Sequence, residues 1–181
     1  MAKKIKKRII LTGAQGTGKT TLMNALAVDG TRTLSIAREA ATNNGGLPTD
    51  EQREEYQKNL FATALKTLSS KKNYISDRGL SCIAAYTFLG ALQDSVKKNV
   101  ADNQYLKLQK FHNDNPDILL VYLPVEFEDI EDDGMRSTDK EHQAAIDFMI
   151  KNILETSGVN YITVTGTVEE RVAQIEAALT K

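Results

Sequence analysis

The sequence LTGAQGTGKTTL, residues 11–22, follows an apolar run and matches the pattern G-x-x-x-x-G-K-[ST] in full. Glycines in such a loop let successive backbone N–H groups point toward one centre, and the helix that follows adds the partial positive charge of its N-terminus. Lysine adds a full charge, and the hydroxyl beside it is a ligand for magnesium. We therefore predict a site for nucleotide phosphates. The residues expected to form it are Gly13, Ala14, Gln15, Gly16, Thr17, Gly18, Lys19, Thr20 and Thr21.

Outward from this loop, apolar runs of strand length alternate with longer runs of helical period. This is the pattern of an α/β fold with a largely parallel sheet. A length of 181 residues suits one domain over residues 1–181. The strands are expected at residues 7–12, 32–37, 73–77, 117–123 and 160–165, and the helices at 19–27, 51–69, 80–89, 94–113, 139–156 and 168–179.

The stretch PVEFEDIEDDGMRST, residues 124–138, fits neither pattern because it is acidic and rich in turn residues. We interpret it as a mobile lid at about 124–140, since long loops inside compact domains are often functional. The alternative is a plain surface loop. As a lid, it would bring Arg136 over a transferred phosphate and exclude water.

Composition narrows the class of protein. The formal net charge of -1 excludes a global positive field for non-specific binding to nucleic acids. The basic run at residues 3–8 is interpreted as a solvated lead-in to the first strand or, alternatively, as a contact to nucleic-acid phosphates. The single cysteine, Cys82, cannot form an internal disulfide, so we expect a core position and a cytoplasmic location. No stretch is long enough to cross a membrane, and the sequence leaves a homodimer undecided.

A carboxylate and an arginine follow the third predicted strand in NYISDRGLS, residues 73–81. Ligands of open parallel sheets bind at the carboxyl ends of the strands, so both side chains are expected to face the phosphate loop. Asp77 is expected to hold magnesium together with Thr20. Arg78 is expected to neutralise charge on a phosphoryl group in transfer. The alternative is a salt bridge at the surface.

A similar pair, Arg38 and Glu39, follows the second predicted strand in LSIAREAA. Glu39 is expected to accept the proton of an attacking hydroxyl, and Arg38 to hold an anionic substrate. The alternative is that Glu39 only complements the positive end of a helix. Between the two carboxylates, Glu39 is favoured as the base because Asp77 is better placed for the metal.

The remaining candidates lie on predicted helices. Tyr56 is expected beside the acceptor, where its ring can stack on a base. His112 and His142 are expected at the surface. Phe61, Leu65 and Leu68 have helical spacing and are expected in the core.

Taken in this order, the motifs resemble those of the P-loop kinases of the nucleoside and nucleoside-monophosphate kinase group, including the nicotinamide-riboside-kinase-like branch. The resemblance is carried by GAQGTGKTT, REAA, SDRG, YLPVEFEDIEDDGMR and TVTGTVEERV. It implies a three-layer fold with a five-stranded parallel sheet in the order 2-3-1-4-5. It also implies ATP and Mg²⁺ as cofactors and transfer of the γ-phosphate to a hydroxyl of a free nucleoside or nucleotide. Thr165 and Gly166 would then border the adenine.

Two other functions are kept open. The chain is similar in size and lid to bacteriophage kinases that phosphorylate 5-hydroxymethyluracil within DNA, which would place it in the host cytoplasm. DNA carrying the modified pyrimidine would then contact the basic run at residues 3–8 and the segment at 41–56, with the base extruded into the site. A P-loop NTPase that acts as a switch or partner-binding ATPase is the different-class alternative. Such an NTPase requires a glutamate that activates water, placed after the strand that carries the magnesium carboxylate. The sequence does not show this glutamate.

Overall fold

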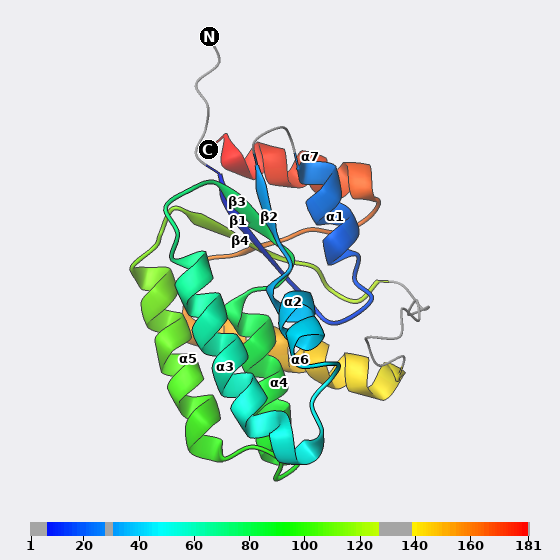
Figure 1. Ribbon diagram of the computed structural model, residues 1–181. Coiled ribbons are helices and arrows are strands. Elements are labelled where there is room, and N and C mark those ends of the chain that lie inside the picture. The colour runs from blue at the N-terminus through cyan, green and yellow to red at the C-terminus, as the bar shows by residue number, and fades with distance from the viewer. Residues whose placement is uncertain (1–6, 28–30, 127–138, 181) are drawn as a thin grey trace.

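The computed structural model describes residues 7–27, 31–126 and 139–180 (Figure 1). The described part contains one sheet with strand order β2-β3-β1-β4-β5, and all neighbouring strands run parallel. The predicted order is therefore confirmed. The strands are β1 (Arg8–Thr12), β2 (Arg32–Leu34), β3 (Tyr74–Ser76), β4 (Ile118–Tyr122) and β5 (Ile162–Thr163).

Helices cover both faces of this sheet, which gives three layers. On one face lie α1 (Lys19–Leu26) and α7 (Val168–Leu179), and on the other lie α3 (Asp50–Leu68), α4 (Leu80–Leu92), α5 (Lys98–Asn113) and α6 (Lys140–Ser157) (Figure 1). Strand β1 is the centre, and all five of its residues are buried. Ile9 and Leu11 pack on the α1 and α7 side, whereas Ile10 packs on the other. Burial on both faces explains why a central parallel strand reads as a continuous apolar run.

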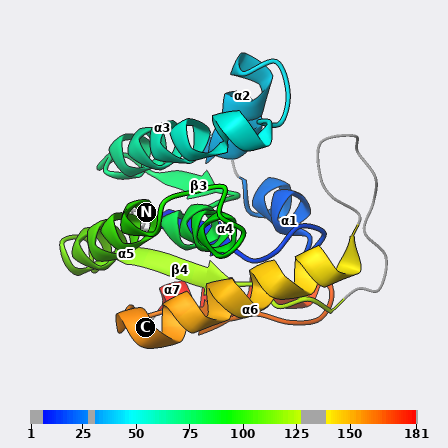
Figure 2. The same ribbon diagram turned by 90° about the horizontal axis from the view of Figure 1, so that it is seen from below.

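Helix α4 lies inside the thicker helical layer, between α3, α5 and α6 (Figure 2). Its sequence LSCIAAYTFLGAL is apolar nearly all round, as expected for a helix without a solvent face. Cys82 is 1% exposed, which confirms its predicted core position. The predicted apolar stripe on α3 is also confirmed, because Phe61 and Leu68 are buried and Leu65 packs against the same core.

The second strand is shorter than predicted. Strand β2 ends at Leu34, and an additional helix, α2 (Ile36–Asn43), begins where the strand was expected to continue. Ile36 and Ala41 are buried in it, with Ala37 and Ala40 packed beside them. This spacing is helical, so contact with the core overrides the strand propensity of the apolar run. Most of the segment at 41–56, expected as a loop on DNA, also belongs to α2 and α3.

The boundary between α4 and α5 was misplaced as well. Helix α4 continues to Leu92 and α5 begins only at Lys98, whereas the predicted end and start were residues 89 and 94. Asp94 adopts a φ of 57°, and the N–H of Ser95 donates to the carbonyl of Gly90. This turn places the break between the two helices at residues 93–97, whereas the predicted break was at 90–93.

Two expected surface features are buried. His112 on α5 is 8% exposed, so its predicted surface position is wrong. Arg8, the last residue of the basic run, is 3% exposed and forms an ion pair with Asp117 and a hydrogen bond of 3.1 Å to Asn115. It is therefore used inside the fold rather than on a nucleic acid. In the described residues, no helix is long and apolar enough to cross a membrane.

Candidate functional site

The phosphate loop occupies the turn between β1 and α1. Gly18 caps α1 in the left-handed conformation, with a φ of 81°, which favours glycine. Gly13 follows β1, and a Cβ atom there would lie 2.4 Å from the carbonyl oxygen of Leu123. The loop can therefore lie against the end of β4 only because residue 13 has no side chain.

Lys19 begins α1 and points back into the loop. Its ammonium group donates hydrogen bonds to the Ala14 carbonyl and to the Thr17 hydroxyl, the latter at 3.2 Å. The Thr17 hydroxyl in turn donates to the Ala14 carbonyl at 3.0 Å. The side chain of Lys19 is buried, so its charge is shielded from bulk water. In this surrounding of lower dielectric constant, the charge acts more strongly on a nearby anion than it would in water.

The ends of β2 and β3 and the first turn of α1 bring a carboxylate and two hydroxyls together beside this loop. Asp77, after β3, accepts from the Thr20 hydroxyl at 3.3 Å and from the Ser35 hydroxyl at 3.1 Å. Oxygen ligands of this kind suit magnesium, which usually binds one or two carboxylates and completes its shell with water and phosphate oxygens. The described residues hold no cluster of three or more His, Cys, Asp or Glu side chains, so a richer all-protein metal cage is absent there. The pair Thr20 and Asp77 fits magnesium bound mainly by phosphates.

Arg78 is held next to the loop by an aromatic ring. Its guanidinium carbon lies 5.3 Å from the centre of the Tyr86 ring, in cation–π contact. The Tyr86 hydroxyl donates to the Gln15 side chain at 3.0 Å. Tyr56 on α3 completes the group: burial raises the pKa of its hydroxyl, and the nearby positive charge of Arg78 partly opposes this. Gln15, Tyr56, Arg78 and Tyr86 thus form a polar and aromatic group beside the phosphate loop.

The other two predicted acceptor residues lie on α2. Arg38 and Glu39 lie in the first half of α2, and both side chains are exposed. Within the described residues, no hydrogen bond or ion pair joins Glu39 to Lys19 or Asp77. Arg136 and most of the predicted lid lie outside the described residues.

A protein-family model described as an AAA domain matches residues 8–171, which is most of the chain. The chain belongs to this AAA-domain family. The match covers the phosphate loop, Asp77 and Arg78. No curated protein matches the chain.

Solved structures show which fold this AAA domain adopts. Deoxyadenosine kinase from M. mycoides, with the product dCMP and a flexible dCDP bound, superposes with a TM-score of 0.67 at 15% identity, covering 96% of this chain and 98% of that chain. NadR protein in complex with NR gives 0.74 at 16% identity, but the match covers 98% of this chain and 52% of that chain. Shikimate kinase from Acinetobacter baumannii in complex with shikimate gives 0.62 at 16% identity, over 96% and 93%. The AAA domain therefore has the fold of P-loop kinases.

Two contacts to the phosphate loop of the AAA domain were missed from the sequence. Gln143 on α6 donates to the Gln15 carbonyl at 2.7 Å, so the N-terminal half of α6 lies beside the loop (Figure 2). On the opposite face of the sheet, Arg171 on α7 donates to the Thr17 carbonyl at 2.8 Å. In each pair the two residues are more than 100 positions apart in sequence. Gln143 stands in none of the quoted motifs, whereas Arg171 belongs to TVTGTVEERV, from which only Thr165 and Gly166 were given a role.

The loop after β5 is braced by the start of α7. The predicted start of this helix at residue 168 is confirmed. Thr167 accepts from the Glu170 N–H at 3.2 Å, and the Glu170 carboxylate accepts from the Thr167 N–H at 2.7 Å. This capping box fixes the entry into the helix. Gly166, one residue earlier, adopts a φ of 91°, and its N–H donates to both carboxylate oxygens of Glu126 at 3.2 Å.

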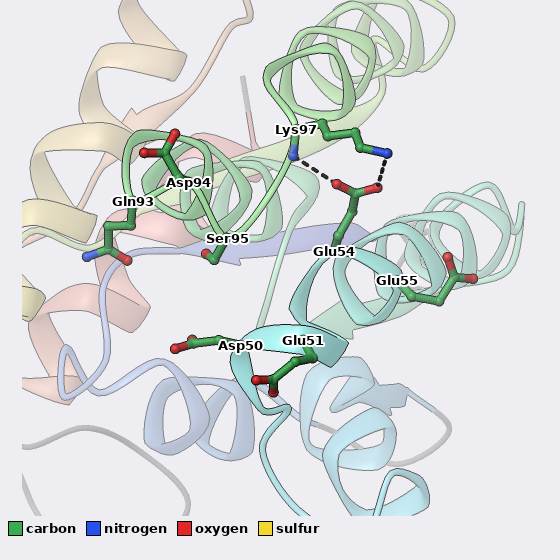
Figure 3. A pocket seen from close by; sticks show the side chains of 8 residues that line it. All are labelled: Asp50, Glu51, Glu54, Glu55, Gln93, Asp94, Ser95 and Lys97. Carbon is green, nitrogen blue, oxygen red and sulfur yellow. Dashed lines mark hydrogen bonds and ion pairs between the residues drawn. The ribbon is translucent and has the colours of Figure 1, made fainter.

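A separate pocket lies between the start of α3 and the turn from α4 to α5 (Figure 3). Its lining is mostly acidic, and Glu54 accepts from the backbone N–H of Lys97 at 2.9 Å. It shares no residue with the phosphate loop. A negative lining repels phosphate groups, so this pocket is not part of the candidate site. The lining residues are Asp50, Glu51, Glu54, Glu55, Gln93, Asp94, Ser95 and Lys97.

Proposed function

We propose that this AAA domain is an ATP- and Mg²⁺-dependent kinase that transfers the γ-phosphate to a hydroxyl of a nucleoside-type acceptor. One observation carries the proposal: the hydroxyl and carboxylate of Thr20 and Asp77 lie together beside a complete phosphate loop, with Arg78 held next to it. Phosphoryl transfer depends mainly on positioning and on neutralising charge, and these residues can supply both. The likeness to a nucleoside kinase and to shikimate kinase supports the reaction class.

One half of the proposed site binds the phosphates of the nucleotide. The N–H groups of residues 13–21 and the Lys19 ammonium would hold the phosphates of ATP. Thr20 and Asp77 would hold magnesium, which neutralises developing negative charge when bound. Arg78 would stabilise the phosphoryl group in transfer, together with Arg136 from the lid. Thr165 and Gly166 would border the adenine.

The acceptor half follows from the group beside the loop. Tyr56 would stack on the acceptor base, with Arg38 holding an anionic part of the acceptor. Glu39 would serve as general base. Because its side chain is exposed on α2, its use requires the acceptor to bind between α2 and the phosphate loop.

A free nucleoside or nucleotide is favoured over a base in DNA. The DNA alternative assigned the backbone contacts to residues 3–8 and 41–56. Arg8 is buried in an ion pair with Asp117, and most of 41–56 is helical. Arg8, one of the expected DNA contacts, therefore has a structural role.

The test is a transfer assay with ATP labelled in the γ-phosphate. Acceptors are free nucleosides, nucleoside monophosphates, and DNA with and without 5-hydroxymethyluracil. We expect label to appear in a free acceptor and ADP release to depend on that acceptor. ADP formed equally fast without any acceptor would instead identify a switch or partner-binding ATPase. Label found only in the modified DNA would identify a DNA kinase.

A further inference from the structure

Arg171 on α7 connects this helix to the phosphate loop. Its side chain is 2% exposed, and one guanidinium nitrogen, Nη1, donates to the Thr17 carbonyl at 2.8 Å. The same nitrogen would lie 3.3 Å from a Cβ atom at Gly18. The guanidinium therefore packs directly against the residues that lead into Lys19.

The other guanidinium nitrogen, Nη2, reaches a different segment. It forms an ion pair with Glu126, which lies four residues after the end of β4 and has a side chain that is 28% exposed. The Glu126 carboxylate also accepts from the N–H of Gly166, with 3.2 Å to each oxygen. One arginine and one carboxylate thus join the phosphate loop, the end of β4 and the loop after β5.

A weaker contact holds the loop after β5 to the same helix. Gln174, one turn beyond Arg171, accepts from the Thr165 N–H at 3.3 Å and donates to the Thr165 carbonyl at 2.8 Å. Gln174 does not contact the phosphate loop. Only the pair of Arg171 and Glu126 links that loop to Gly166 within the residues described. An ion pair adds little net stability when its charges are taken out of water, because their desolvation is costly. The expected role of this pair is therefore to fix the geometry of the segments that it joins.

We infer that Arg171 is a positioning residue that, through Glu126, sets the spacing between the phosphate loop and Gly166. In a bound nucleotide these two places would meet the phosphates and the base, so the ion pair would align both ends of one ligand. This inference rests on the nucleotide site of the proposed function, but not on phosphoryl transfer. Tightly fixed spacing increases affinity because less ordering is needed on binding.

The test compares Mg²⁺-ATP with Mg²⁺-tripolyphosphate, which lacks the base and the sugar. Calorimetric titration is made on the full chain, with Glu126→Ala and Arg171→Met as variants and Glu169→Ala as the matched control. Glu169 is an exposed carboxylate in the first turn of α7, and among the described residues its side chain forms no hydrogen bond or ion pair with either loop.

We expect Glu126→Ala to weaken ATP about tenfold while changing tripolyphosphate less than about twofold, since Arg171 keeps its bond to Thr17. Arg171→Met should weaken both ligands, and Glu169→Ala neither. Melting curves identify any variant that no longer folds, in which case Glu126→Ala alone decides. The inference is overturned if Glu126→Ala leaves ATP binding unchanged, or weakens both ligands equally. An absence of phosphoryl transfer would refute the proposed function and leave this binding result standing.

Discussion

The hydroxyl of Tyr86 donates a hydrogen bond to the side chain of Gln15 at 3.0 Å, across 71 residues of sequence. The ring of the same tyrosine is in cation–π contact with the Arg78 guanidinium. Helix α4 therefore fixes the arginine relative to the phosphate loop through one side chain. We expect the hydroxyl of Tyr86 to contribute to the distance of Arg78 from the loop, and its ring to the orientation of the guanidinium.

Tyr86→Phe separates these two roles, because it removes the hydroxyl and keeps the ring. We expect kcat to fall about threefold to tenfold, as for the loss of one partly buried hydrogen bond. The free energy of unfolding should fall by about 1 kcal/mol for the same reason. Tyr86→Leu should lower kcat further, since the cation–π contact is lost as well. Tyr105→Phe is the control, because its hydroxyl bonds Thr156, away from the site, at 3.1 Å. Equal activity of Tyr86→Phe and wild type would show that the bond to Gln15 does not position Arg78.

Lys19→Ala removes the buried ammonium group from the phosphate loop. We expect transfer to fall at least about 100-fold, because a preorganised charge at the phosphates is lost. The fold should persist, since Lys19 lies outside both hydrophobic core clusters. Initial rates and circular dichroism measure the two effects, with the exposed Lys98→Ala as control. Turnover near the wild-type rate would argue against the site.

Asp77→Asn tests the metal assignment. We expect the Mg²⁺ concentration for half-maximal rate to rise about tenfold or more, because a carboxylate next to the ion becomes a neutral amide. Ser35→Ala removes a hydrogen bond to Asp77 and should give a smaller rise in the same direction. A fall in rate that Mg²⁺ cannot restore at any concentration would indicate that Asp77 acts directly on the reacting groups.

His112 makes stability depend on pH. Burial lowers the pKa of His112 to about 4, from 6.5 for the ordinary side chain. Between these values the unfolded chain binds a proton that the folded chain does not, so stability is full above pH 6.5 and falls as the pH drops toward 4. The loss amounts to about 3 kcal/mol. His112→Gln should flatten this part of the curve of unfolding free energy against pH. The same slope in both proteins would assign it to other groups, such as His142, whose pKa burial also lowers.

What the sequence could predict depended on the range of each interaction. The place of the glycine-rich loop between a strand and a helix, the start of α7 after Thr167 and the alternation of strands and helices follow from local patterns, and the structure confirms these three features. Helix α2 was missed because an apolar run of this length suits a strand or a buried helix equally well. The contacts of Gln143 and Arg171 with the phosphate loop bring together residues that only the folded sheet places side by side.

Gly13 limits how the chain can vary. The nearest obstacle to a side chain at this position is the backbone carbonyl oxygen of Leu123, at 2.4 Å, and the Thr17 hydroxyl follows at 2.9 Å. No exchange of a nearby residue removes a carbonyl oxygen. A genetic selection for suppressors of Gly13→Ala should therefore return true revertants, whereas lesions at positions crowded by side chains can be rescued from a second site.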